Sequence, residues 1–120
     1  MSTINIHVFE NAKRVMNDSF AVILEYFIED AEMYFAEMSE FIEENDVEKI
    51  MSHTRSIRTY ANQFGAEDVS DIANNIELLC LSAAKEETLD LEEVKNLCLQ
   101  LNEAFEDFTL KANELTRKNI

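Results

Sequence analysis

The sequence predicts an all-α fold: an antiparallel up-and-down four-helix bundle with an additional short N-terminal helix. Residues that break helices are scarce, because the chain contains no proline and only one glycine. Apolar residues recur at spacings of three and four along four long segments, which is typical of the buried face of amphipathic helices. Short turns separate these segments, and short connections favour antiparallel neighbours.

The first predicted helix is short and runs from about Ile6 to Met16. We expect it to cover one end of the bundle. The residues from Asn17 to Ser19 offer an N-cap for a long second helix, from about Phe20 to Glu44. The apolar face of the second helix consists of Phe20, Leu24, Phe27, Ala31, Phe35, Met38 and Ile42.

The third helix is predicted from Val47 to Phe64, after a turn and cap at Asn45 and Asp46. Gly65 follows the helix, at the position where a left-handed residue often ends one. The buried stripe of this helix is narrow and consists of Ile50, Thr54, Ile57, Ala61 and Phe64.

The fourth helix spans about Glu67 to Lys85, and the sequence EETLD (86–90) then breaks the chain before Asp90 caps the fifth helix. The inward residues of the fourth helix are Val69, Ile72, Ala73, Ile76, Leu79, Cys80 and Ala83. Those of the fifth are Leu91, Val94, Leu97, Cys98, Leu101, Phe105, Phe108 and Leu115. We expect each stripe to form core rather than a cofactor pocket.

Length and charge limit the class of protein. A chain of 120 residues favours one domain over 1–120, with enough length to bury a core. The formal net charge of −15 disfavours nucleic acid and anionic membrane surfaces as partners. No stretch approaches the roughly 18 to 20 apolar residues of a membrane span. The N-terminus does not have the pattern of a signal peptide, so we expect a cytoplasmic protein.

The sequence predicts neither a metal site nor an active site. Cys80 and Cys98 are 18 residues apart, and no His/Cys cluster surrounds them, so we interpret both as small core residues. The acidic residues Glu43, Glu44 and Asp46 lack the loop spacing and glycine of a calcium site. No Ser/His/Asp or Cys/His set indicates hydrolysis. We expect a protein without cofactors that is not an enzyme.

The third helix carries an unusual charge distribution for so acidic a chain. No Asp or Glu lies between Glu48 and Glu67, whereas Lys49, Arg55 and Arg58 do lie there. With the buried stripe at zero on a helical wheel, Arg55 lies near about 140° and Arg58 near about 80°. The sequence therefore predicts a cationic strip on an exposed face. This strip could be chance and solvation, or a docking site for an acidic pocket, because arginine binds carboxylates in a bidentate manner.

Three further polar residues lie on the same helix. Asn62 lies near about 120° and Thr59 near about 180°, so both extend the patch of the two arginines. His53 lies near about −60°, at the boundary of the buried face. We expect His53 to make a local hydrogen bond and not to face the partner of Arg55.

The stretch "TRSIRTYANQFGA", from Thr54, resembles the motif of histidine-containing phosphotransfer (HPt) domains. That motif reads Ala-His-Ser/Thr-Leu/Ile-Lys-Gly, then five residues, then Gly-Ala. Ile57 matches the apolar position, Arg58 matches the lysine, and 64–66 (FGA) matches the end of the motif. The flanking helices are also similar, so the resemblance covers about residues 5 to 115.

The chain departs from the HPt pattern where the chemistry of the family takes place. The phosphorylatable histidine of the motif falls on Arg55, and the glycine after the lysine falls on Thr59. If His53 were the active histidine, its distance to Gly65 would be two residues too long. A shift of two residues turns a side chain by about 200° around the helix.

The resemblance implies an HPt bundle whose usual partners are response-regulator receiver domains and histidine kinases. Our hypothesis is a pseudo-HPt protein that docks on such a partner through Arg55, Arg58, Thr59 and Asn62 without passing phosphate. One alternative is an active phosphotransfer protein that carries phosphate on His53. Another is a helical adaptor or dimerisation domain without a phosphorelay role.

Oligomeric state stays open between a monomer and a weak homodimer. Val22, Tyr26 and Met33 are predicted on the outward side of the second helix. They could be scattered surface residues, or they could contact a partner or a second copy.

Overall fold

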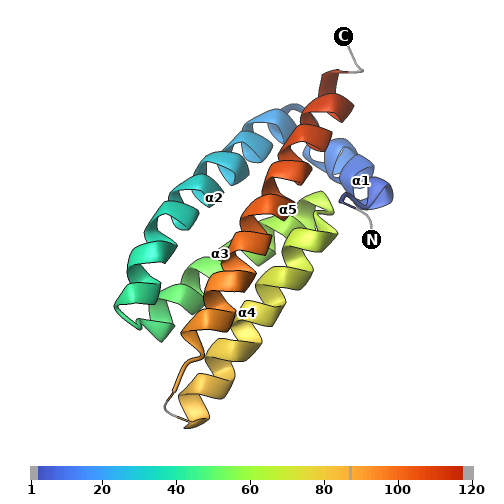
Figure 1. The fold of residues 1–120 in the computed structure, drawn as a ribbon. Coiled ribbons are helices and arrows are strands. Elements are labelled where there is room, and N and C mark those ends of the chain that lie inside the picture. Colours follow the sequence, from blue (N-terminus) through green and yellow to red (C-terminus); the bar gives the residue numbers. More distant parts are fainter. Residues whose placement is uncertain (1–2, 87, 118–120) are drawn as a thin grey trace.

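The computed structural model describes residues 3–86 and 88–117 and shows that this part of the chain is helical throughout its regular structure (Figure 1). The elements are α1 (Ile6–Met16), the 3₁₀ turn η1 (Asn17–Ser19), α2 (Phe20–Glu43), α3 (Val47–Phe64), α4 (Glu67–Glu86) and α5 (Leu91–Arg117). The predicted all-α bundle with a short first helix is confirmed, and the predicted helix ends lie within two residues of the observed ones.

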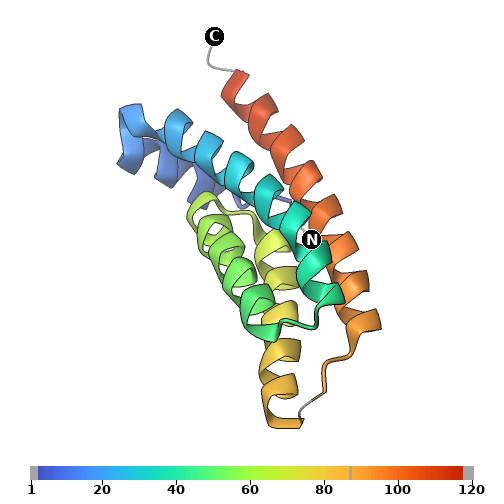
Figure 2. The ribbon, with the colours of Figure 1, turned by 90° about the vertical axis from the view of Figure 1, so that its left-hand side faces the viewer.

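Helices α2 to α5 alternate in direction and form a ring. Helices α2 and α4 each pack against both α3 and α5. Figure 2 shows the consequence: α3 and α5 lie on opposite sides of the bundle. The outer face of α3 is therefore flanked by α2 on one side and by α4 on the other.

Most of the predicted caps are confirmed. The Asp46 carboxylate accepts a hydrogen bond from the backbone N–H of Lys49 at 3.2 Å, and Asp90 accepts one from Glu93 at 3.1 Å. Gly65 has a φ of 73° and ends α3 in the left-handed conformation. Within the predicted break EETLD, Glu87 lies outside the described residues.

The predicted N-cap before α2 is wrong. Asn17 to Ser19 form a 3₁₀ turn that leads straight into α2, and the side chain of Ser19 makes no capping hydrogen bond. The reason is the backbone of Ser19, which is helical with φ −85° and ψ −11°. An N-cap side chain needs a non-helical backbone to reach back to the first turn.

Helix α1 covers one end of the bundle, as predicted. The backbone N–H of Asn5 donates to the carbonyl of Gly65 at 2.7 Å, which fixes α1 to the end of α3. The Asn5 side chain accepts from the N–H of Val8 at 3.2 Å and caps α1. The ring of Phe9 is fully buried and meets Phe20 edge to face at 5.3 Å.

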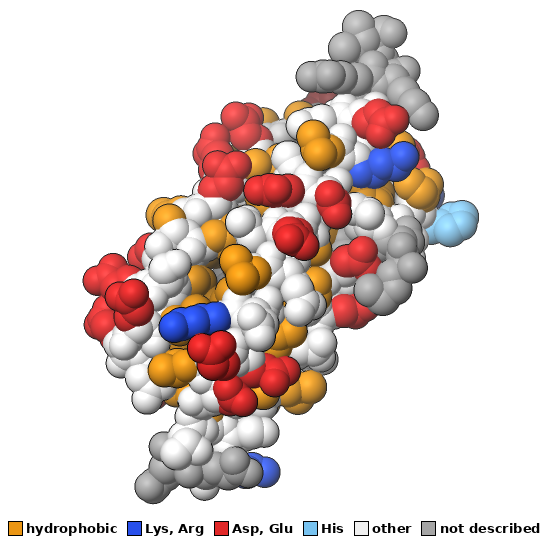
Figure 3. All heavy atoms as spheres, in the orientation of Figure 1, with side chains coloured by type: hydrophobic (Ala, Val, Ile, Leu, Met, Phe, Trp, Pro, Cys, Tyr) orange, Lys and Arg blue, Asp and Glu red, His pale blue; other side chains and the backbone are white. Residues whose placement is uncertain are grey.

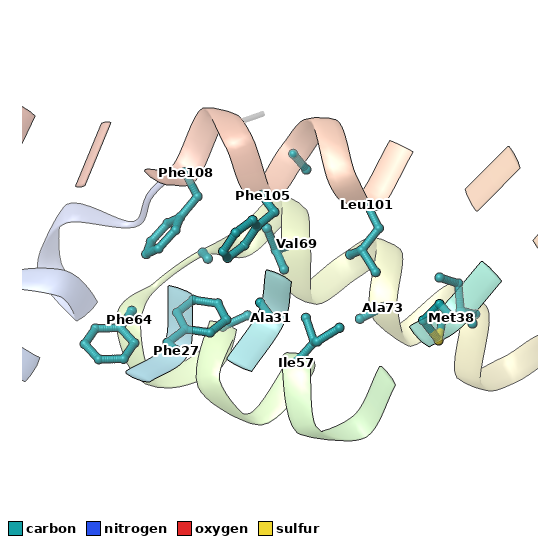
Figure 4. Packing of buried hydrophobic residues seen from close by; sticks show 14 of the residues in the cluster. Phe27, Ala31, Met38, Ile57, Phe64, Val69, Ala73, Leu101, Phe105 and Phe108 are labelled. Atoms are coloured by element: carbon teal, nitrogen blue, oxygen red, sulfur yellow. The ribbon is translucent and has the colours of Figure 1, made fainter. Parts of the chain in front are cut away.

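An aromatic cluster forms the core where α2, α3 and α5 meet (Figure 4). Phe27 of α2 stacks on Phe64 of α3 at 5.8 Å and contacts Phe105 and Phe108 of α5, each at 5.5 Å. The hydroxyl of the buried Thr54 donates to the carbonyl of Ile50 at 2.6 Å, so its polar group is satisfied within the helix. The predicted buried stripe of α3 is confirmed at every residue.

Acidic side chains are spread widely over the face that has α5 in front (Figure 3). None of the described helices is long and apolar enough to cross a membrane.

Candidate functional site

The outer face of α3 carries the four residues that the sequence predicted for docking. The buried stripe of α3 faces the core, which turns the opposite side of the helix to solvent. The side chain of Arg55 is 55% exposed and that of Arg58 is 34% exposed. Thr59 and Asn62 are exposed as well. The four residues thus share one accessible face of one rigid helix.

The two arginines meet a carboxylate from α4 that the sequence analysis did not include. Arg55 Nε donates to Glu77 Oε1 at 2.9 Å. Arg58 donates from Nε to Glu77 Oε2 and from Nη2 to Oε1, the second contact at 3.3 Å. Only 7% of the Glu77 side chain is exposed. Two guanidinium groups therefore share one nearly buried carboxylate.

This carboxylate corrects the expected character of the strip. The sequence predicts a cationic strip, because α3 itself has no acid between Glu48 and Glu67. With Glu77 included, Arg55 and Arg58 contribute a formal net charge of +1 instead of +2. The two arginines and Glu77 together are still positive on a protein with a formal net charge of −15. Hydrogen bonds to Glu77 hold both guanidinium groups in place, which the sequence did not indicate.

The two polar residues of the face are fixed locally. The hydroxyl of Thr59 donates to the carbonyl of Arg55 at 2.9 Å, within α3. The side chain of Asn62 accepts a hydrogen bond from the hydroxyl of Ser70 on α4 at 2.6 Å. Asn62 therefore helps to join α3 to α4.

A hollow of about 480 Å³ lies beside Arg55, between α2 and α3. The lining residues are Tyr34, Arg55, Ser56, Thr59, Tyr60 and Gln63. The hydroxyl of Tyr60 donates to Asp30 at 3.2 Å. Burial and this hydrogen bond raise the pKa of Tyr60, so the phenol stays neutral and the hollow gains no negative charge from it.

His53 lies at the boundary of the buried face, as predicted. Its side chain is 19% exposed, and its ring lies 4.4 Å from the ring of Tyr34 and 5.0 Å from that of Phe41. Its Nε2 atom lies 3.4 Å from Glu37 Oε1, and this atom has no hydrogen-bond partner among the described residues. The expected local hydrogen bond is therefore replaced by a longer contact, which becomes an ion pair when the imidazole is protonated.

Sequence reasoning missed Glu77 as well as the tyrosines of the hollow. The available signal for Glu77 was its position on the flank of the apolar stripe of α4, between Ile76 and Cys80. That signal does not say which flank faces α3, because the answer depends on how the helices are ordered around the bundle.

The two thiols have the character of core groups. Cys80 is buried, and burial is the main cause that raises its pKa. Burial also raises the pKa of Cys98 to about 11. Both thiols are therefore protonated near neutral pH and are poor nucleophiles and metal ligands in this state. Among residues 3–86 and 88–117, no group of three or more His, Cys, Asp or Glu side chains could hold a metal ion.

Comparisons with known proteins agree with this architecture. The Hpt domain family matches residues 22–115. The crystal structure of histidine-containing phosphotransfer protein B from Pseudomonas aeruginosa PAO1 is similar to this chain with a TM-score of 0.78 and 19% sequence identity. The similarity covers 97% of this chain and 96% of that one, and at this identity it shows a shared fold. No curated protein matches the chain. The match to most of its length establishes that this chain belongs to the Hpt domain family.

Proposed function

We propose that this protein is a non-phosphorylatable Hpt protein that docks on a receiver domain or histidine kinase of a two-component system. In this proposal it modulates phosphorelay without carrying phosphate and is not an enzyme. The family supports the general part, because Hpt domains take part in phosphotransfer between two-component kinases and receivers. The claim that the protein docks without carrying phosphate rests on the residue that stands in the place of the phosphohistidine.

The observation that carries the proposal is Arg55. It falls at the motif position of the histidine, and its side chain is more than half exposed on the outer face of α3. Phosphotransfer requires a nucleophilic imidazole nitrogen, whereas a guanidinium stays protonated at physiological pH and is a poor nucleophile. Arg55 can therefore bind an anionic pocket but cannot accept its phosphoryl group.

The chemistry of the face fits the usual partner of the family. The resemblance to HPt domains implies a receiver with an acidic pocket around a phospho-accepting aspartate. An arginine that enters this pocket meets carboxylates with its planar set of donors, the geometry in which arginine binds best. Occupation of the pocket blocks phosphorelay, and preferential binding to one receiver state shifts the population of that state.

The environment of His53 gives no support to the alternative phosphocarrier. Its ring lies between Tyr34 and Phe41, and its exposed fraction is about a third of that of Arg55. A phosphorylated partner would have to reach this boundary position past α2. We therefore keep Arg55 as the centre of the proposed interface.

The test is a binding experiment with the receiver domains and kinases of the same organism. Arg55→Ala is the best variant, because it leaves Arg58 in place on Glu77, whereas Arg58→Glu would set a second carboxylate against a buried one. We expect Arg55→Ala to weaken binding about 30-fold or more, since central arginine anchors cost about 2 kcal/mol or more when truncated.

Arg14→Ala is the matched control, because Arg14 is an exposed arginine on α1 and its removal changes the net charge equally. We expect its affinity to stay within about twofold of wild type, as is usual for charges outside an interface. Equal affinities of wild type and Arg55→Ala for every partner that binds would refute the proposed docking face.

A further inference from the structure

We propose that Glu77 is the positioning residue of the docking face, which is the outer face of α3. We also propose that the two arginines bound to Glu77 have different roles. In this scheme Arg58 holds the carboxylate in place, and Arg55 presents its free donors to the partner. The inference rests on the proposed docking function. It adds a residue of α4 that determines how Arg55 is presented.

The carboxylate of Glu77 is nearly buried and is compensated by the two arginines. Its side chain is 7% exposed, and burying a charge is costly unless hydrogen bonds and an opposite charge compensate for it. Three N–H donors supply this compensation: Nε of Arg55, and Nε and Nη2 of Arg58. Glu77 therefore forms a defined network with the two arginines instead of a loose surface ion pair.

The two arginines use Glu77 differently. Arg58 reaches both carboxylate oxygens through two of its nitrogens, and its side chain is the less exposed of the two at 34%. Arg55 donates from Nε alone and is 55% exposed. Within residues 3–86 and 88–117, Nη1 and Nη2 of Arg55 make no hydrogen bond. These two nitrogens form the part of the network that is available to a partner.

This arrangement prepares Arg55 for binding. A free arginine side chain loses considerable rotamer freedom when it enters an interface. The bond from Nε to Glu77 restricts that freedom before the partner arrives, while the two Nη groups keep the geometry for bidentate binding of a carboxylate. Glu77 also cancels one of the two positive charges, so the face recognises an acidic pocket by donor geometry more than by total charge.

Glu77→Gln tests the positioning of Arg55, because it removes the negative charge of the carboxylate and changes the shape of the side chain very little. The amide keeps one acceptor oxygen but places an NH₂ donor where the second carboxylate oxygen was. In wild type Oε1 accepts from both arginines and Oε2 from Arg58 alone. When the amide oxygen takes the place of Oε2, it keeps the bond from Arg58 Nε, and the NH₂ group, itself a donor, faces Nε of Arg55. We expect Arg58 to keep the remaining oxygen and Arg55 to become free.

The first readout uses the protein alone. We expect the ¹⁵Nε–¹H NMR signal of Arg55 to show restricted motion in wild type and fast motion and faster exchange with water in Glu77→Gln. Asp71→Asn is the matched control, because Asp71 is an exposed acid on the same helix. Its removal changes the charge equally and should leave the Arg55 signal unchanged. Unchanged Arg55 dynamics in Glu77→Gln would overturn the proposed positioning, whether or not any receiver binds.

The second readout uses a receiver domain that binds wild type. We expect Glu77→Gln to weaken binding about tenfold, the effect of ordering one long side chain on binding. In the Arg55→Ala background the same change should have less than about a twofold effect, because Glu77 then has no anchor to position. An equal loss in both backgrounds would mean that Glu77 acts through the fold, and it would overturn the inference.

A second variant covers the case in which Glu77→Gln does not fold. Glu77→Asp keeps the charge and shortens the side chain by one methylene, so a smaller loss of binding is expected, again only when Arg55 is present. If Arg55→Ala does not alter binding but the NMR result holds, the docking proposal fails and the positioning of Arg55 stands. The two failures can therefore be distinguished.

Discussion

At the scale of single residues, the proposed function depends on the chemistry of position 55. At position 55 an imidazole would be able to carry a phosphoryl group, whereas the guanidinium of Arg55 can only bind one. Its neighbour Arg58 stands at the lysine position of the motif and is largely occupied by Glu77. In the proposed docking function, the residue that reaches a partner and the residue that supports it are therefore different, although both are arginines.

Gly65 is the residue at which a single added methyl group should have the clearest effect on stability. Its φ is 73°, and a Cβ atom there would lie 2.7 Å from the carbonyl oxygen of Asn5. We expect Gly65→Ala to lower the free energy of unfolding by about 1 to 3 kcal/mol, the typical cost of such a strained conformation. Urea denaturation measures this change.

Asn45 provides the control for Gly65, because it also has a positive φ, of 56°. Asparagine tolerates this conformation, so Asn45→Gly should change the free energy of unfolding by less than about 1 kcal/mol. If Gly65→Ala were as stable as wild type, the close packing of residue 5 against the end of α3 would be contradicted.

At the scale of elements, local sequence signals predict the helix ends, but they do not predict the Arg55–Glu77 pair of the candidate site. Asp46, Gly65 and Asp90 mark their helix ends because capping involves only neighbouring residues. The pairing of Arg55 with Glu77 joins α3 to α4 across 22 positions in the chain, and periodicity does not encode it. The sequence could therefore predict the four residues on the face of α3, but not the carboxylate that orders two of them.

The same limit explains the error before α2. Asn17 to Ser19 have the composition of a cap, and the sequence alone does not show that the chain turns there without leaving a helical backbone. α1 contacts residues farther along the chain through the bond from Asn5 to Gly65 and the packing of Phe9 on Phe20. The composition of residues 17–19 does not encode these contacts.

The attachment of α1 can be tested through its most deeply buried ring. Phe9 is fully buried against Phe20, so Phe9→Ala leaves a cavity between α1 and α2. We expect the free energy of unfolding to fall by about 3 to 5 kcal/mol. Hydrogen exchange should accelerate first in α1, because this helix loses its main anchor.

Val15→Ala is the control on the same helix, since Val15 is 71% exposed and should change stability by no more than about 0.5 kcal/mol. Equal stability of Phe9→Ala and Val15→Ala would show that α1 is not anchored by this ring.

At the scale of the whole molecule, the charge of −15 acts on every state of the protein. Acidic residues are spread over the face that Figure 3 shows, and a net charge this far from zero repels itself more in the compact state than in the unfolded chain. The positive face of α3 is a local exception on this surface. A net charge of this size repels phosphate-rich surfaces, and the proposed docking therefore depends on the local geometry of α3.

Salt should therefore stabilise the fold. Between about 20 mM and about 0.5 M sodium chloride the Debye length falls severalfold, which screens the repulsion. We expect the melting temperature to rise by about 4 °C, which corresponds to roughly 1 kcal/mol in a domain of 120 residues. Differential scanning calorimetry measures this shift. A melting temperature that falls with salt would mean that ion pairs outweigh repulsion in the folded state.

The most direct test of the central claim is phosphotransfer and binding measured in the same samples. Wild type, Arg55→His and His53→Ala are incubated with a phosphorylated receiver or kinase of the same organism. The account predicts that wild type binds without acquiring label and that Arg55→His acquires acid-labile phosphate. Label on wild type that disappears in His53→Ala would contradict it and would make this protein a working phosphocarrier.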